Sequence, residues 1–161
     1  MTDKSETTDD SSEPPARPHP PRLILDANVL LNAITAPAST ILGQLHARFR
    51  RGEIRSLFSE ALLTEFQQML TYPRIKERFK LGAGDGFAVA RDLLLLGEYV
   101  SPVPRFDWPT LTDPKDWYLL DLLFEAQADA LVTQDRAVLR AGQALSLPVL
   151  HPKDLRAAKL I

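Results

Sequence analysis

Short apolar runs alternate with longer segments of helical periodicity along most of this chain. The runs predict strands of four or five residues, at 22–26, 55–59, 99–103, 130–133 and 147–150. The segments between them predict helices, at 38–51, 60–80 with a break at Pro73, 84–97, 114–128, 136–143 and 152–159. Alternating strands and helices imply right-handed crossovers and a parallel sheet that is covered on both faces. We therefore expect a single α/β sandwich.

The first 21 residues depart from this pattern. They hold five of the 13 prolines and five acidic residues, with almost nothing apolar to bury. Such a composition cannot offset the entropy lost on ordering, so we predict a disordered N-terminal tail at 1–21. Residues 22–161 are long enough to bury one core, and we expect them to form a single domain.

Composition excludes several classes of protein. The 19 Lys and Arg nearly balance the 21 Asp and Glu, which argues against a protein that coats nucleic acid by bulk positive charge. Because cysteine is absent, so are disulfides, thiolate nucleophiles and sulfur-ligated metals. No apolar run is long enough for a membrane span or a secretory signal, and we expect a cytoplasmic location. Glycine-rich phosphate loops are also missing.

Two acidic residues follow predicted strands. Asp26 comes directly after the first strand, and Asp135 comes shortly after the fourth. In a parallel α/β sheet, ligands bind outside the carboxyl ends of the strands. Both residues are also suited to capping a helix or forming a turn. The sequence leaves the two interpretations open.

Further acids have equally ambiguous surroundings. Glu65 lies beside the apolar stripe of a predicted helix, where a carboxylate needs a cation, unless it reaches solvent or Arg74 at the rim. Asp113 and Asp116 flank a proline in a typical helix start, which explains both without any function. Asp121 and Glu125 share a helix face with Tyr118, and we expect both carboxylates to be solvated.

Together these residues resemble the PIN-domain family. The segments that carry the resemblance are Leu23–Leu31, the helix around Glu65 with Tyr72-Pro73-Arg74 after it, Asp113–Asp116, and Leu131–Asp135. The resemblance extends from about Arg22 to about Leu155. More narrowly, the chain is similar to the VapC-like ribonucleases, a bacterial branch described as the toxin components of toxin–antitoxin systems.

The resemblance implies a three-layer α/β/α sandwich around a parallel sheet of about five strands, and a metal-dependent ribonuclease. Its acidic quartet corresponds to Asp26, Glu65, Asp116 and Asp135, with Asp113 as the alternative to Asp116. Asn28 and Thr133 correspond to supporting polar residues. The chain departs from the pattern at Trp117, where relatives often have a second aspartate, and at Gln134, where a small residue is common.

The chemistry of such a quartet can be argued from the residues. Converging carboxylates repel one another unless a proton or a divalent cation is bound. Oxygen ligands favour Mg²⁺ or Mn²⁺, as one ion or two, and a zinc site is disfavoured because the chain has only His19, His46 and His151. We expect Asp26 and Asp116 to share the metals, with the other two acids holding one each, for hydrolysis of an RNA phosphodiester.

An acidic site repels phosphate, so the RNA must be held elsewhere. Between residues 46 and 80, eight basic residues stand against four acids. The candidates for contact with the RNA backbone are Arg48, Arg50, Arg51, Arg55, Arg74, Lys76, Arg78 and Lys80. A solvated helix face explains the same run. The family resemblance also implies a small antitoxin protein and a homodimer as partners; the apolar run Leu93–Leu96 suits a dimer contact or a buried helix equally well.

Two other functions fit the pattern less well. A phosphoacceptor receiver domain needs a second acid beside Asp26, an aspartate ending its third strand and a lysine ending its fifth, and the third strand here ends near Val100. A PIN fold that binds RNA or an antitoxin but cuts poorly is the stronger alternative, because of changes such as Trp117.

Overall fold

A computed structural model of the chain describes residues 19–161. The predicted tail at 1–21 therefore lies almost entirely outside the described residues. Of its last residues, Pro21 already belongs to the fold, because its carbonyl oxygen accepts a hydrogen bond of 2.8 Å from the backbone N–H of Arg55.

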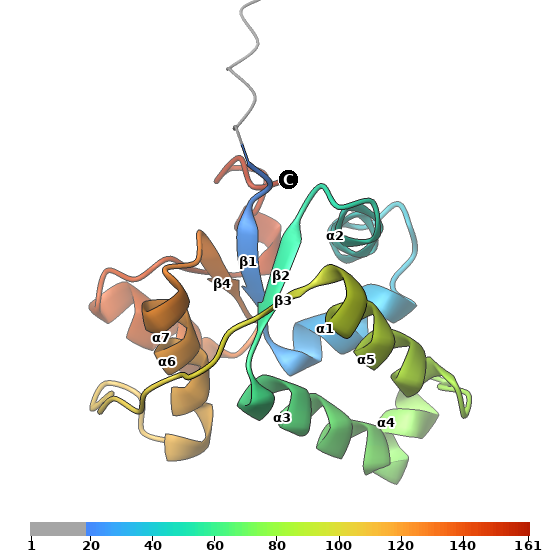
Figure 1. The fold of residues 1–161 in the computed structure, drawn as a ribbon, viewed down its shortest axis with the longest axis horizontal. Helices are drawn as coiled ribbons and strands as arrows, with labels where there is room; N and C mark the ends of the chain where they lie inside the picture. The colour runs from blue at the N-terminus through green and yellow to red at the C-terminus, as the bar shows by residue number, and fades with distance from the viewer. Residues whose placement is uncertain (1–18) are drawn as a thin grey trace, which may run out of the picture.

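The centre of the fold is a parallel sheet of five short strands (Figure 1). The strands are β1 (Arg22–Leu25), β2 (Arg55–Phe58), β3 (Glu98–Tyr99), β4 (Ala130–Val132) and β5 (Val149–Leu150). Their order across the sheet is β3-β2-β1-β4-β5, and every neighbouring pair is parallel. Ile24 in the central strand pairs with Leu57 on one side and Leu131 on the other, and all three are fully buried.

Helices cover both faces of this sheet. The α-helices are α1 (Ala27–Thr35), α2 (Ile41–Arg50), α3 (Glu60–Thr71), α4 (Pro73–Arg78), α5 (Asp85–Leu96), α6 (Trp117–Ala126) and α7 (Arg136–Ala144). In Figure 1, α1, α2 and α5 lie on one side of the strands, and α6 and α7 lie on the other. Two short 3₁₀ helices, η1 (Pro114–Asp116) and η2 (Pro152–Asp154), complete the described elements. The predicted three-layer α/β/α sandwich is confirmed.

The connections create a topological switch point at one edge of the sheet. After β1 the chain enters α1 on one face, whereas after β4 it enters α7 on the opposite face (Figure 1). β1 and β4 are neighbours in the sheet, so two connections that leave in opposite directions start side by side at the carboxyl ends of these strands. Such a switch point is where open α/β sheets place their ligands.

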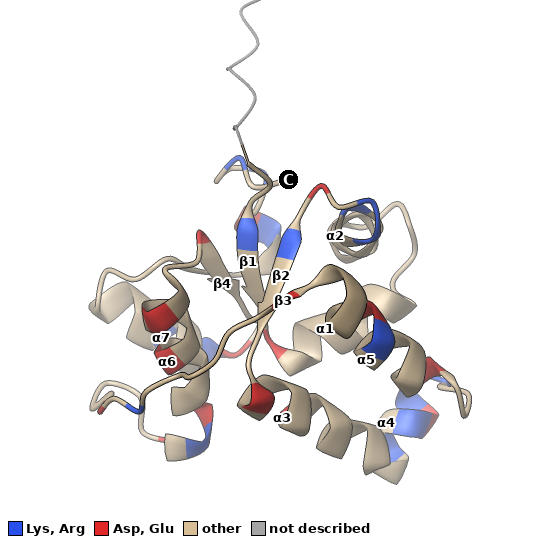
Figure 2. Cartoon of the chain, in the orientation of Figure 1, with Lys and Arg blue, Asp and Glu red and all other residues tan. Residues whose placement is uncertain are grey.

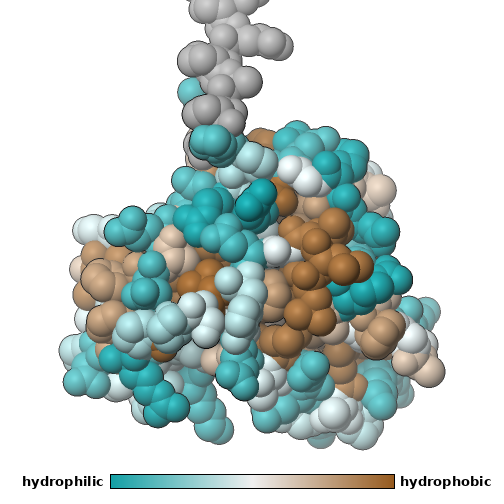
Figure 3. Space-filling view, in the orientation of Figure 1, coloured by the Kyte–Doolittle hydropathy of each residue, from teal (hydrophilic) through white to brown (hydrophobic). Residues whose placement is uncertain are grey.

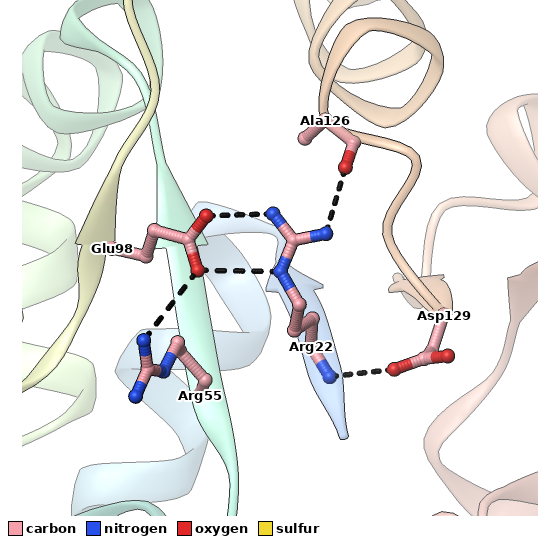
Figure 4. Close-up of polar contacts among 5 residues, drawn as sticks. All are labelled: Arg22, Arg55, Glu98, Ala126 and Asp129. Carbon is pink, nitrogen blue, oxygen red and sulfur yellow. Dashed lines mark hydrogen bonds and ion pairs between the residues drawn. The ribbon is translucent and has the colours of Figure 1, made fainter. Parts of the chain in front are cut away.

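The amino edge of the sheet is joined by a network of polar contacts (Figure 4). The Arg22 guanidinium donates to both carboxylate oxygens of Glu98, at 2.6 and 3.2 Å, and to the Ala126 carbonyl oxygen at 2.9 Å. The Arg22 backbone N–H donates to Asp129 at 2.7 Å, and Arg55 lies 3.9 Å from Glu98. These contacts connect the first residues of β1, β2 and β3 to the segment before β4.

The first helix was not predicted from the sequence. In α1, five of the nine residues are buried, and the three polar residues, Asn28, Asn32 and Thr35, share one face of the helix. The helix is short and begins one residue after β1, so the apolar residues of the two elements look like a single run in the sequence. It ends at Ala36, directly before Pro37.

Two predicted elements are wrong. The strand predicted at 99–103 contains only the last residue of β3, because Pro102 and Pro104 have no N–H with which to continue the ladder. The helix predicted at 152–159 is a single 3₁₀ turn, η2, followed by turns that include Lys159 at φ 55°.

The run Leu93–Leu96 divides between core and surface. Leu93 is 1% exposed, whereas Leu94, Leu95 and Leu96 are 62%, 72% and 44% exposed. Figure 3 shows apolar side chains gathered over this part of α5. A buried helix therefore accounts for the first leucine only. None of the helices in the described part of the chain has the length and apolar character that a membrane crossing requires.

Candidate active site

Asp26 lies at the switch point, at the carboxyl end of β1. Its side chain is only 8% exposed, and its Oδ2 accepts a hydrogen bond of 2.7 Å from the hydroxyl of Thr133, which follows β4 and is fully buried. The Asp26 backbone N–H donates to the carbonyl oxygen of Val132 at 3.0 Å. Although Asp26 precedes the first residue of α1, its side chain makes no capping hydrogen bond. Capping therefore does not explain this carboxylate.

Asp135 is connected to Asp26 through the same threonine. Its backbone N–H donates to the Thr133 hydroxyl oxygen at 3.0 Å. Its Oδ1 accepts from the backbone N–H groups of Ala137 and Val138, at 2.8 and 3.3 Å, so the predicted cap of the following helix is confirmed. Capping uses only Oδ1, and Oδ2 accepts no hydrogen bond from a described residue.

The structure separates Asp113 from Asp116. Asp113 is exposed, and its Oδ1 caps η1 by accepting a hydrogen bond of 3.0 Å from the Lys115 backbone N–H. Asp116 is half-buried at the junction of η1 and α6, and its side chain makes no capping hydrogen bond. The helix-start interpretation thus explains Asp113 and leaves Asp116 without a structural partner among the described residues.

Glu65 is exposed on α3 and forms no ion pair with Arg74. Of the two surroundings expected for it, the rim position is therefore the observed one. Its negative charge nevertheless raises the pKa of both Asp26 and Asp116, so the carboxylate lies within electrostatic reach of the switch point.

Burial and neighbouring acids raise the pKa of Asp26 and Asp116. Burial raises the pKa of Asp26, the hydrogen bond from Thr133 opposes this, and the charges of Asp135 and Glu65 raise it further. Burial, followed by the charges of Asp135, Asp113, Asp26 and Glu65, raises the pKa of Asp116 to about 6. No described Lys, Arg or His lies within 4.0 Å of the four carboxylates. The protein thus gathers negative charge here without supplying a counter-charge.

This set of donors fits a hard divalent cation in its chemistry. The four carboxylates and the hydroxyl of Thr133 provide oxygen only, which Mg²⁺ and Mn²⁺ prefer. Within residues 19–161, no three His, Asp or Glu side chains are already close enough together to hold one ion. Asn28, the other predicted supporting residue, is exposed on α1 and forms no side-chain hydrogen bond with a described residue.

Sequence reasoning missed Tyr118 and misplaced Asp121. Burial, followed by the charges of Asp26, Glu65 and Asp116, raises the pKa of the Tyr118 phenol, so this ring lies within electrostatic reach of three of the four acids. Asp121 is 6% exposed rather than solvated, because its Oδ1 accepts hydrogen bonds from the Phe106 backbone N–H and the Trp108 indole N–H, at 3.0 and 2.8 Å. No signal in the sequence shows that the segment before α6 folds back onto this helix. Glu125 is exposed, as predicted.

The basic run separates into two groups (Figure 2). Arg48 and Arg51 pair with Glu53, Arg50 pairs with Asp92, and Arg55 pairs with Glu98. The bases on and just after α4 are exposed and make no ion pair with a described residue; they are Arg74, Lys76, Arg78 and Lys80. The α4 group is therefore the one whose positive charge is available to a ligand.

Comparison with known proteins gives one result. No curated protein matches the chain significantly. A family model described as a PIN domain matches residues 22–137, which include β1 to β4, the switch point and all four acids of the quartet. PIN domains are usually nucleases, and acidic residues at a switch point agree with such an activity. Because the match covers most of its length, this chain belongs to the PIN-domain family.

Proposed function

We propose that this protein is a metal-dependent endoribonuclease that hydrolyses RNA phosphodiester bonds at the carboxyl edge of its sheet. The observation that carries the proposal is that burial and neighbouring acids raise the pKa of both Asp26 and Asp116, with no described Lys, Arg or His paired with any of the four carboxylates. Unpaired carboxylates raise the free energy of the folded protein. They lie where α/β sheets bind their ligands, and an external cation bound there would offset this cost.

In this proposal, Asp26, Glu65, Asp116 and Asp135 hold one or two Mg²⁺ or Mn²⁺ ions. When bound, such an ion provides a reactive water and offsets negative charge on the phosphate. The Thr133 hydroxyl orients Asp26 and fixes the backbone of Asp135. Asn28 is the second residue of α1, and we assign it a role in supporting the acidic quartet. We assign Asp116 rather than Asp113 as the third ligand, because Asp116 is half-buried, and burial and the charges of the other three acids raise its pKa, whereas Asp113 is exposed.

The exposed basic residues of the α4 group bind the RNA backbone in this proposal. They are Arg74, Lys76, Arg78 and Lys80, and none of them is committed to an acidic partner among the described residues. Phosphate contacts of this kind position a nucleic acid without reading its sequence. Arg48 and Arg51 are weaker candidates, because each already pairs with Glu53.

The test is cleavage of a labelled RNA with Mn²⁺ by the full chain and its Asp26→Asn variant. Asparagine keeps the shape of the side chain and an acceptor for Thr133 but removes the charge that a cation needs, so we expect cleavage to fall by about 100-fold or more. Asp113→Asn is the matched control and should cut within about twofold of the parent, since a neutral side chain still caps η1. Cleavage that survives both EDTA and Asp26→Asn refutes the proposal.

The alternative function is a PIN-fold binding module that holds RNA or an antitoxin and cuts poorly. Trp117 favours it, because this indole stands where relatives often have a further acid, and its N–H is engaged at 2.8 Å by the Leu111 carbonyl oxygen. Calorimetric titration with Mn²⁺ separates the two functions. A nuclease binds Mn²⁺ and loses it on Asp26→Asn, whereas a binding module with an impaired quartet takes up no Mn²⁺.

The biological role that we propose is that of the toxin in a toxin–antitoxin pair, acting on RNA in the cytoplasm. It rests on the resemblance of the chain to that branch of the family. A small antitoxin protein and a second copy of the chain are the partners that follow, and the exposed leucines of α5 are the surface that we assign to the homodimer. Light scattering of the parent and of a Leu95→Lys variant tests the dimer, which the lysine should dissociate.

A further inference from the structure

Two adjoining cavities open beside the acidic quartet, between α6 and the segment that precedes it. Their volumes are about 300 and 430 Å³, which lies at the lower end of the range for small-ligand pockets. Arg105, Tyr118 and Asp121 line both cavities. We call the two cavities together the α6 hollow. Pro114 and Trp117 line the larger cavity, and Asp116 lies between them in the chain, so the hollow adjoins this member of the acidic quartet.

The walls of the α6 hollow combine three chemistries. Tyr118 and Trp117 contribute aromatic rings. Arg105 contributes a guanidinium that is exposed and forms no ion pair or side-chain hydrogen bond with a described residue. Asp121 contributes a carboxylate. Aromatic rings with a free guanidinium are the means by which proteins hold an unstacked base and its phosphate.

Asp121 presents one oxygen to the hollow. Both hydrogen bonds that it accepts, from Phe106 and Trp108, end on Oδ1. Oδ2 accepts no hydrogen bond from a described residue. Oδ2 is nevertheless not fully buried, because Ser56 Oγ is the only fully buried side-chain polar atom without a partner in the described chain. A carboxylate that lines a cavity accepts hydrogen bonds from the amino group of a base, as acidic side chains do with the N4 amino group of cytosine.

We propose that the α6 hollow binds the RNA nucleotide next to the bond that is cut, and that Asp121 selects a base with an amino group. The base stacks against Trp117 and Tyr118, its amino group donates to Asp121 Oδ2, and its phosphate lies on Arg105. This inference rests on the proposed nuclease function and adds a preference for cytosine or adenine over uracil at that position.

The test measures binding separately from cleavage. Fluorescein-labelled ten-residue oligocytidine and oligouridine are titrated, in EDTA, with the full chain that carries Asp26→Asn, and anisotropy reports Kd. We expect oligocytidine to bind about tenfold more tightly than oligouridine, the effect of one hydrogen bond to a charged group. Arg105→Gln should weaken both by about fivefold or more, and Arg140→Gln, an exposed arginine outside the hollow, should change neither.

Asp121→Asn gives the readout that a purely structural role cannot produce. Asparagine keeps an oxygen for the Phe106 and Trp108 hydrogen bonds but turns the free acceptor into a donor, so the preference should shift toward oligouridine, whose bases offer carbonyl oxygens at this edge. Equal affinity of the parent for both oligomers, binding to neither, or an unchanged preference in Asp121→Asn overturns the inference.

Parallel cleavage assays with Mn²⁺ keep the two proposals distinct. If the wild-type chain cuts RNA but the variants of the hollow bind like their parent, the nuclease function stands and this inference fails. If the hollow discriminates between bases while the wild-type chain does not cut, the base pocket stands and the nuclease function fails.

Discussion

Both edges of the sheet carry acidic residues, but among the described residues these are paired with arginines at the amino edge and unpaired at the carboxyl edge. At the amino edge, the Arg22 guanidinium binds Glu98 through two hydrogen bonds, and Arg55 adds a second positive charge (Figure 4). At the carboxyl edge, Asp26 and Asp116 have only other carboxylates as charged neighbours that shift their pKa. The first arrangement stabilises the fold, whereas the second costs stability as long as no cation is bound.

The pKa shifts express the same contrast. The hydrogen bond from Arg22, with the charges of Arg22 and Arg55, lowers the pKa of Glu98 against the opposing effect of burial. Burial and neighbouring acids raise the pKa of Asp26 and Asp116. Acids that are left unpaired at one edge, while charges are paired at the other, make the first edge the candidate for a functional site.

The largest expected effect is stabilisation by metal at the carboxyl edge alone. Mn²⁺ at about 100 times its Kd should raise the free energy of unfolding by about 2.7 kcal/mol, because it binds the folded state only. Asp26→Asn should abolish this gain, and Glu98→Gln, at the amino edge, should retain it. Thermal unfolding with and without Mn²⁺ measures both. A gain that persists in Asp26→Asn would mean that the quartet is not the site of binding.

The next effect is a pH dependence in the absence of metal. The pKa of Asp116 is about 6 in the folded state and 3.8 as its ordinary value, so between these values the folded state holds the proton more tightly. This group therefore adds stability as the pH falls from 7 to 5 and removes it as the pH rises. After allowance for its partial exposure, Asp116→Asn should raise the free energy of unfolding at pH 7 by about 1 kcal/mol and flatten that slope. Urea titrations in EDTA at pH 7 and pH 5 test this, and a steeper slope in the variant contradicts it.

A smaller effect of opposite sign is expected at the amino edge. Glu98→Gln should lower the free energy of unfolding near pH 7 by about 0.5–1 kcal/mol, because its pair with Arg22 is only partly buried. The pKa of Glu98 is lowered, so its contribution is present above its ordinary value of 4.5 and is lost as the pH falls below it. Urea unfolding should thus find the two proteins converging in acid. Glu125→Gln, an exposed acid of α6 without an ion pair among the described residues, is the control and should change little.

The smallest effect concerns the basic groups and leaves stability unchanged. Replacing Arg74 and Arg78 with glutamine should reduce the salt dependence of RNA binding by about 1.4 in the log–log slope, the contribution of two contacts to a single strand. Replacing Arg48 and Arg51 should leave the slope as it was, because both already pair with Glu53. Anisotropy titrations at several salt concentrations measure the slope. If the salt dependence is unaltered when Arg74 and Arg78 are replaced, the α4 group is only a solvated helix face.

Strands that contain buried, branched side chains were predictable because their composition and their neighbours in the chain specify them. The sequence placed β1, β2 and β4 to within one residue, and with them the position of Asp26 after a strand. It failed for α1, which is only nine residues long and begins one residue after β1, and for β3, which ends early because two prolines follow it.

The acidic positions show the same division. In the sequence, a turn or a helix start was an alternative explanation for Asp26, Asp113, Asp116 and Asp135. The structure assigns capping hydrogen bonds to Asp113 and Asp135 and none to Asp26 or Asp116. Hydrogen bonds of this kind depend on side-chain direction, which a spacing along the chain does not specify.

The sequence by itself determined the parallel α/β architecture, the oxygen-only chemistry of the candidate site and the order of its four acids, because composition and periodicity are properties of the chain. Only the tertiary structure decided which charges are paired. It joins Arg22 to Glu98, 76 positions apart in the chain, and Thr133 to Asp26, 107 positions apart. It also places Tyr118 and Asp121 at two cavities that no sequence pattern predicted. The physical reason is that burial and charge pairing depend on distances in space, and in a parallel sheet the residues that meet at one edge come from segments far apart in the chain.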